Sequence, residues 1–159
     1  MMIAVIGGDN PSQDVLPAAE AVGKEIASQG HTLICGGRGG VMEAACKGAR
    51  EAGGHTIGIM PGHSSSDANE YVEFPIVTNM GFARNAIIAL TADALIAIDG
   101  SYGTLSEIAM ALGYGKPVIG LDTWRLTPGS GVEDDRIVRA ESPAQAVERA
   151  VAAAGGGEA

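Results

Sequence analysis

The sequence predicts an α/β fold in which a doubly wound parallel sheet forms the middle of three α-β-α layers in a single domain. Short apolar runs alternate with longer helix-forming segments, which is typical of strand–helix–strand units. The clearest apolar run has no polar interruption, as expected for a strand that helices cover on both faces. Glycine-rich turns follow several of the runs and provide the tight connections that this fold requires.

The predicted strands are short apolar runs bounded by glycine, proline or acidic turn residues. The clearest is Ala94–Ile98, which lies between Asp93 and Asp99 and predicts a buried central strand. An extended stretch is expected over 71–78, after a polar loop at 63–70. The other strands are expected at residues 3–6, 31–35, 55–60, 117–121 and 137–138.

The predicted helices are runs of good helix formers that are mostly terminated by glycine. The segment 80–91 is apolar nearly all round, which predicts a buried helix. Residues 122–135 predict a surface loop, and we expect a disordered tail at 155–159 after a domain of residues 1–154. The helices are expected at residues 13–29, 41–52, 80–91, 105–112 and 143–154.

Composition and charge restrict the function. Apolar residues make up 46% of the 159 residues and charged residues 18%, which predicts one domain with a full core. The formal net charge is −9 and lysine and arginine do not cluster, so no nucleic acid is expected as a partner. The apolar start lacks the basic residues of a signal peptide, and the longest apolar reach is too short to span a bilayer. We therefore expect a cytoplasmic protein that makes no membrane contact.

Neither a metal site nor a bound cofactor is expected. Cys35 and Cys46 lack the spacing of a metal or redox motif, and we interpret them as small buried residues, with a reactive Cys35 as the alternative. The lysines are Lys24, Lys47 and Lys116, and none has the context of a residue that binds pyridoxal phosphate. A lysine decarboxylase is therefore not expected.

Glycine-rich loops predict the ligand site. In a doubly wound sheet, ligands bind beyond the carboxyl ends of the strands, where helix N-termini present unpaired N–H groups and a positive dipole end to an anion. The loops match neither GxGxxG nor a Walker A motif, so plain tight turns are the alternative to binding a small phosphorylated molecule. The residues expected to bind the ligand from these loops are Gly8, Gly36, Gly37, Arg38, Gly39, Gly40, Gly100, Ser101, Tyr102, Gly103 and Thr104.

Two charged residues near these loops are candidates for chemistry. Thr104 and Glu107 have the spacing of a capping box, and the spacing by itself favours this structural role. The alternative is a Glu107 carboxylate that faces the ligand as a general base or stabilises a cationic sugar transition state. Arg84 lies in an apolar segment and needs either an ion pair, solvent, or a phosphate or carboxylate of the ligand.

The segment Met80-Gly81-Phe82-Ala83-Arg84, paired with the stretch from Gly100 to Glu107, resembles the LONELY GUY (LOG) family. The likeness covers about residues 3–121. LOG proteins are Rossmann-like and have a Met-x-x-x-Arg-Lys helix start and a Pro-Gly-Gly-x-Gly-Thr-x-x-Glu turn. The resemblance implies a phosphoribohydrolase that cleaves the N-glycosidic bond of a nucleoside 5′-monophosphate. It implies Arg84 and Glu107 as the catalytic pair and the glycine loops as the phosphate site.

Departures from the LOG pattern favour a second interpretation. Asn85 stands where LOG enzymes have lysine, and Asp99 and Ser101 replace the proline and the second glycine of the turn. These changes resemble a sister branch that includes molybdenum-cofactor carrier proteins, which bind a phosphorylated pterin without turnover. The resemblance thus leaves two alternatives, hydrolase and carrier, with Asn85 among the ligand-binding residues. It also implies a homo-dimer or homo-tetramer, with the helix around Ile87 and Ile88 as the expected subunit contact.

Overall fold

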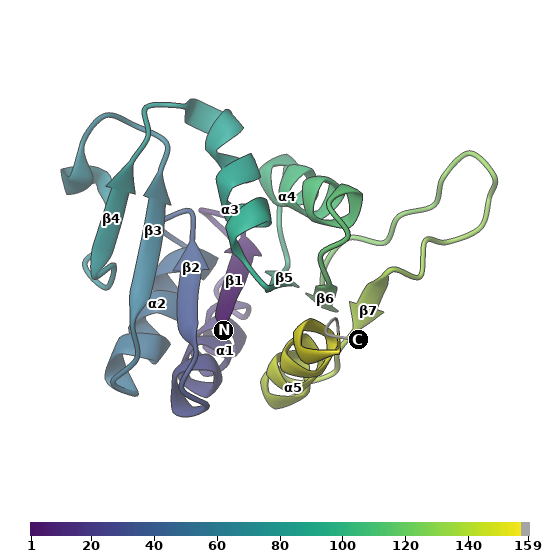
Figure 1. The fold of residues 1–159 in the computed structure, drawn as a ribbon, viewed down its shortest axis with the longest axis horizontal. Helices are drawn as coiled ribbons and strands as arrows, with labels where there is room; N and C mark the ends of the chain where they lie inside the picture. Colours follow the sequence, from purple (N-terminus) through teal and green to yellow (C-terminus); the bar gives the residue numbers. More distant parts are fainter. Residues whose placement is uncertain (157–159) are drawn as a thin grey trace.

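The computed structural model describes residues 1–156 and confirms the predicted fold, because a seven-stranded parallel sheet lies between two layers of helices (Figure 1). The strands are β1 (Met2–Gly7), β2 (Thr32–Cys35), β3 (Thr56–Met60), β4 (Phe74–Val77), β5 (Ala94–Ile98), β6 (Val118–Leu121) and β7 (Ile137–Arg139). Their order in the sheet is β4-β3-β2-β1-β5-β6-β7. The order reverses between β1 and β5, which is where doubly wound sheets bind ligands.

Helices cover both faces of the sheet and divide the core in two. On one face α1, α2 and α5 pack against the sheet, and on the other face α3 and α4 do so (Figure 1). Two short 3₁₀ helices, η1 and η2, lie in the connections. The bounds are α1 (Leu16–Ser28), α2 (Val41–Glu51), η1 (Ser65–Asp67), η2 (Gly81–Arg84), α3 (Asn85–Thr91), α4 (Tyr102–Gly113) and α5 (Pro143–Gly155).

Most elements lie within a few residues of their predicted bounds, and the differences have local causes. The first helix begins at Leu16 rather than at 13, and Pro17 in its first turn suits a helix start because proline has no N–H to leave unpaired there. The segment 80–91 divides into η2 and α3. Gly155, predicted in the tail, is the last residue of α5, and residues 157–159 of that tail lie outside the described residues.

The ends of β1 and β5 are held beside the start of α2. Gly7 and Ile98 are register partners at the carboxyl ends of the two strands. A Cβ atom on Gly7 would stand 2.5 Å from Cγ1 of Val41 and 2.7 Å from the carbonyl oxygen of Ile98. Glycine at position 7 therefore lets the first turn of α2 pack directly against the end of the sheet.

The helices α1 and α2 also pack with their backbones in close contact. A Cβ atom on Gly23 would stand 1.9 Å from the carbonyl oxygen of Ala45, and a Cβ atom on Gly48 would stand 1.9 Å from that of Glu20. Each helix thus contributes one glycine to the crossing. This contact fixes the position of α2, and with it the N-terminal turn that α2 brings to the switch point.

Two predictions about buried residues have different outcomes. Cys35 and Cys46 are both buried free thiols, as predicted, and their Sγ atoms are 3.5 Å apart. On α3, Ile88 is fully buried in the core and Ile87 is partly buried against it, but Leu90 of the same helix is exposed, so the subunit contact expected at this helix stays a prediction. Among residues 1–156, no helix has both the length and the apolar character to cross a membrane.

Candidate functional site

A pocket of about 160 Å³ lies at the switch point of the sheet. Its walls come from the loops that follow β1 and β2, from η2 and the start of α3, and from the first turns of α2 and α4. It brings together most of the charged and polar residues predicted for the site. The lining residues are Gly7, Asp9, Arg38, Met42, Phe82, Arg84, Asn85, Ser101, Gly103, Thr104 and Glu107.

Two helix N-termini reach this pocket. The first backbone bond of α4 runs from the N–H of Leu105 to the carbonyl of Ser101, so the three N–H groups before Leu105 lie outside the intrahelical pattern. The α2 helix begins after Gly40, but the N–H of Val41 donates to the carbonyl of Gly8 at 3.0 Å. One amide of the first loop is thus used within the protein, and the α4 turn offers the more complete set of donors to an anion.

Arg84 forms the floor of the pocket and is only 8% exposed. Its guanidinium donates to the side-chain oxygen of Asn85 and to the carbonyl of Gly36, the latter at 3.3 Å, and it lies 3.8 Å from Oε1 of Glu107. Within the described residues its Nε atom is buried without a hydrogen-bond partner. Burial lowers the pKa of Arg84, yet an arginine keeps its proton in a protein. The floor therefore carries a positive charge with an unused donor.

Glu107 contributes a carboxyl group to the same floor and is 6% exposed. Burial raises the pKa of Glu107 to about 8, and the neighbouring Arg84 counteracts only part of this effect. Near neutral pH the carboxyl therefore carries its proton for most of the time and can donate a hydrogen bond or a proton. The charge of Arg84 is then available to an anion rather than neutralised by Glu107.

Asn85 connects the floor to the α4 turn. Its amide nitrogen donates to Oγ of Ser106 at 2.9 Å and to the carbonyl of Gly103 at 3.4 Å, while its oxygen accepts from Arg84. Ser106 donates in turn to the Gly103 carbonyl at 2.6 Å. The neutral amide, at the position where LOG enzymes have lysine, thus holds Arg84 and the α4 turn at a fixed distance from each other.

The capping box predicted from the spacing of Thr104 and Glu107 does not form. The α4 helix begins at Tyr102, and its N-cap is Ser101, whose side chain makes no capping bond. Thr104 lies inside the first turn, where its hydroxyl is buried without a partner among the described residues. The helix starts early because Gly100 adopts a φ of +116° and packs against Thr104, so the turn closes before the position that the sequence favours.

Other predicted residues surround the pocket without lining it. Gly36 lies beneath Arg84, where a Cβ atom would stand 2.4 Å from Nη2 of the arginine. Asp99 has a φ of +49° and does not line the pocket, so its negative charge is not among the groups of the pocket wall. For the predicted residues that do not line the pocket, a contact with a ligand stays a prediction. Those residues are Gly8, Gly36, Gly37, Gly39, Gly40, Gly100 and Tyr102.

The sequence interpretation did not include four lining residues, Gly7, Asp9, Met42 and Phe82. The Gly7-Gly8 pair directly after the first strand was a usable signal for the first two. Asp9 pairs with Arg38, with 2.9 Å between its Oδ2 and the arginine Nε. Phe82 gave no signal, because it is one apolar residue in an apolar segment, yet it is 81% exposed.

A larger hollow of about 420 Å³ adjoins the pocket and shares Asp9 and Arg38 with it. Asn69 closes its far side by donating to the carbonyls of Gly37 and Arg38, at 3.3 and 2.8 Å, and so holds the loop after β2 in place. The hollow thus extends the recess at the switch point beyond the pocket. Its lining residues are Asp9, Arg38, Gly39, Glu43, Asp67, Ala68 and Asn69.

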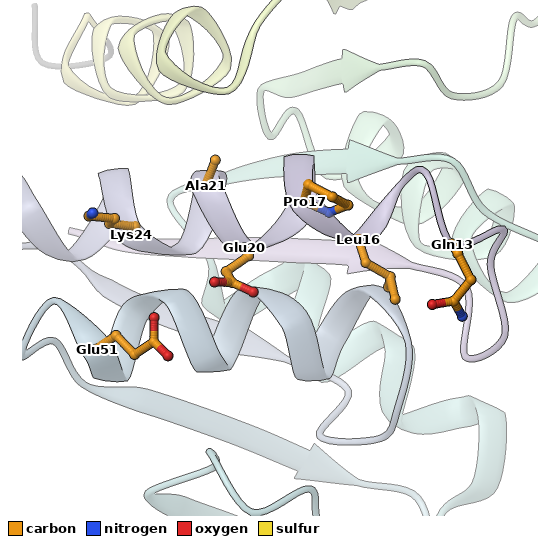
Figure 2. A pocket seen from close by; sticks show the side chains of 7 residues that line it. All are labelled: Gln13, Leu16, Pro17, Glu20, Ala21, Lys24 and Glu51. Atoms are coloured by element: carbon orange, nitrogen blue, oxygen red, sulfur yellow. The ribbon is translucent and has the colours of Figure 1, made fainter.

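A separate hollow lies between α1 and α2 (Figure 2). Figure 2 shows Glu20 on α1 and Glu51 on α2 beside it. Nζ of Lys47 is 3.0 Å from the Glu20 carboxylate and 3.8 Å from that of Glu51. None of the residues that line this hollow was predicted for the site, and its carboxylates already have a cation. Ion pairs through Lys47 therefore join the two helices beside this hollow, and the hollow is not a second candidate site.

The fold and the pocket together define a class: a doubly wound α/β protein that carries a buried arginine beside helix N-termini at the switch point of its sheet. The chain matches the model of the SLOG cluster4 family over residues 1–147. It belongs to that family. This match confirms the superfamily that the motifs around Arg84 and Glu107 indicate.

Two relatives and two solved structures place the chain within the superfamily. An uncharacterised protein of Archaeoglobus fulgidus is 44% identical, over 92% of each chain. A cytokinin riboside 5′-monophosphate phosphoribohydrolase of Mycobacterium tuberculosis is 34% identical over 77% of this chain and 71% of its own length.

The solved structures belong to the sister branch. The molybdenum cofactor binding protein of Rippkaea orientalis superimposes with a TM-score of 0.87, 37% identity and 95% coverage of both chains. The molybdenum cofactor carrier protein of Chlamydomonas reinhardtii gives a TM-score of 0.80, with 35% identity and 96% coverage of both chains. The predicted resemblance to this branch is therefore confirmed.

Proposed function

We propose that this protein binds a small phosphorylated molecule of the nucleotide or pterin type in the 160 Å³ pocket. The observation that carries the proposal is the pair of buried donors without partners among residues 1–156, Nε of Arg84 and the hydroxyl of Thr104, beside the first turn of α4. Buried polar atoms are normally satisfied, and a phosphate oxygen would satisfy both. The charge of Arg84 and the N–H groups of the α4 turn favour a dianion at the same place.

The first candidate is a carrier of a phosphorylated cofactor such as molybdenum cofactor, which would be cargo rather than a catalytic group. Two solved structures with about 95% mutual coverage are described as proteins that bind or carry this cofactor. The residues here suit its phosphate, because the floor has a free positive charge and buried donors. The adjoining hollow of about 420 Å³ offers space for the remainder of the molecule.

The second candidate is a phosphoribohydrolase, which the close approach of Arg84 and Glu107 favours. The relative from Mycobacterium tuberculosis bears the name of such an enzyme. In this reaction the bond from C1′ to the base nitrogen breaks, water oxygen bonds to C1′, and a proton passes to the base. A glutamic acid with a pKa of about 8 is suited to proton transfer near neutral pH.

A binding experiment tests the proposal common to both candidates. We expect ribose 5-phosphate and AMP to bind the native protein in calorimetry, and we expect Arg84→Met to weaken both roughly 10- to 100-fold, because the substitution removes charge-assisted hydrogen bonds. Arg125→Met, on an exposed loop, is the control and should bind as the native protein does. If neither compound binds, or if Arg84→Met binds equally well, the pocket is not a phosphate site.

A turnover experiment separates the two candidates. The native protein is incubated at high concentration with AMP, and adenine and ribose 5-phosphate are measured by chromatography. Release that disappears in Glu107→Gln supports the hydrolase. Tight binding of AMP or of phosphorylated pterin without release of any base supports the carrier.

We also propose a cytoplasmic homo-dimer or homo-tetramer. Leu90 on α3 and Met80 before η2 are apolar and about half exposed, at 53% and 48%. Exposed apolar side chains on one side of a molecule favour a subunit contact. Light scattering tests this proposal, and a monomer at micromolar concentration would contradict it. Cell fractionation tests the location.

A further inference from the structure

Phe82 is an aromatic residue at the pocket that neither candidate function uses. It lines the pocket and yet is 81% exposed. Its ring edge lies over the α4 turn, since Cε1 would be 3.6 Å from a Cβ atom on Gly103. The ring therefore stands beside the N–H groups of the proposed phosphate site, with most of its surface open to a bound molecule.

The position of Phe82 follows from the single turn of η2. A 3₁₀ helix has three residues per turn, so residues two apart point in different directions. In this turn Arg84 is buried in the floor, and Phe82 consequently projects from the pocket rim. Gly81, with a φ of +55°, allows the chain to enter the turn in this orientation. The residue that binds anions and the residue that presents an aromatic face are thus set by the same turn.

We infer that Phe82 is the stacking surface for a planar heterocycle, either a purine or a pterin, that is linked to the phosphate in the pocket. This inference rests on the proposed function and narrows its ligand from phosphorylated molecules in general to those with an aromatic ring. Stacking between a base and an aromatic side chain tolerates different rings, because each has a π face. Phe82 therefore determines the selection of heterocyclic phosphates over sugar phosphates.

The test compares the binding of AMP, GMP and a phosphorylated pterin with that of ribose 5-phosphate, by calorimetry, in the native protein and in variants. We expect Phe82→Ala to weaken the heterocyclic ligands roughly 10- to 100-fold and to leave ribose 5-phosphate within about twofold. Phe82→Tyr should retain the native preference. Phe74→Ala, on the exposed edge strand β4, is the matched control and should change neither kind of ligand.

Each outcome decides between the inference and the underlying proposal. If ribose 5-phosphate does not bind even the native protein and Arg84→Met has no effect on any ligand, the phosphate site itself fails. If ribose 5-phosphate binds but AMP, GMP and the pterin bind no tighter, the stacking surface alone is refuted. A Phe82→Ala protein that loses all ligands equally, or that changes only its oligomeric state in light scattering, likewise overturns the inference. If the heterocyclic ligands do bind tighter than ribose 5-phosphate, tighter binding of the purine nucleotides or of the pterin identifies which heterocycle the site takes.

Discussion

Glu107 is the residue whose ionisation the fold changes most among the pocket residues. Burial raises its pKa from 4.5 to about 8. Between these values the folded protein holds a proton at Glu107 that the unfolded chain has released. The contribution of this group to stability is therefore fully present below about pH 4.5 and falls as pH rises toward 8, with a slope of up to about 1.4 kcal/mol per pH unit.

Glu107→Gln should remove this slope. We expect the free energy of unfolding of the variant, measured in urea between pH 5 and pH 8, to fall less steeply than that of the native protein, so that the variant gains relative stability as pH rises. Exposed Glu148→Gln is the control and should follow the native curve. Parallel curves for Glu107→Gln and the native protein would show that Glu107 is ionised in the fold.

Gly36 acts on the pocket through Arg84. A Cβ atom at position 36 would stand 2.4 Å from Nη2 of Arg84 and 2.8 Å from the sulfur of Met42, and both are ends of flexible side chains. We expect Gly36→Ala to displace the guanidinium and weaken ribose 5-phosphate binding about tenfold, while the free energy of unfolding changes by less than about 1 kcal/mol. Unchanged affinity in calorimetry would mean that the position of the Arg84 guanidinium does not depend on glycine at position 36.

At the scale of elements, the crossing of α1 and α2 has no room for a side chain. A Cβ atom on Gly23 would meet a backbone oxygen at 1.9 Å, which no rotation of a side chain can relieve. We expect Gly23→Ala to lower the free energy of unfolding by about 1–3 kcal/mol or more, because the helices must separate. Urea denaturation with an unchanged m-value measures this loss.

Gly113 offers a matched control for that substitution. It is the last residue of α4, and nothing lies within 4 Å of where its Cβ atom would stand. Gly113→Ala should be neutral or should raise stability by up to about 1 kcal/mol through helix propensity. Equal effects of the two substitutions would contradict the close helix crossing.

The α4 helix shows what local patterns can and cannot predict. The apolar run of β5, the glycine turn and the helix after it were all predictable, because burial and turn chemistry are properties of short stretches. The capping box at Thr104 and Glu107 was also a local prediction, but it is wrong. Its failure has a local and a distant cause: Gly100 closes the turn early, and Arg84, which is distant in sequence, lies beside Glu107.

At the scale of the molecule, ligand binding and stability are linked. A ligand at 100 times its Kd stabilises the folded state by about 2.7 kcal/mol. For a chain of this size that corresponds to a rise in Tm of roughly 5–10 °C. We expect AMP or ribose 5-phosphate to produce such a rise in calorimetric melting, and Arg84→Met to show less than half of it. No shift at saturating concentration would contradict the proposed site.

The whole fold was more predictable than the site. Alternation of strands and helices indicates a doubly wound sheet, and such sheets place their loops at one edge, so Arg38, Ser101 and Gly103 were expected near each other. The sequence cannot indicate which residues line a pocket, since that depends on side-chain direction. Phe82 and Met42 are both apolar residues, and only the packed molecule separates the exposed one from the buried one.

The contrast between the floor and the rim of the pocket bears on how a new ligand preference can be engineered. The floor depends on Gly36, where a Cβ atom would displace the Arg84 guanidinium, and on the hydrogen bond from Arg84 to Asn85. The rim consists of Asp9 and Arg38, from the loops after β1 and β2, and of Phe82 from η2. A mutant library confined to the rim is therefore expected to yield folded binders with altered selectivity, whereas randomising the floor should mainly yield inactive proteins.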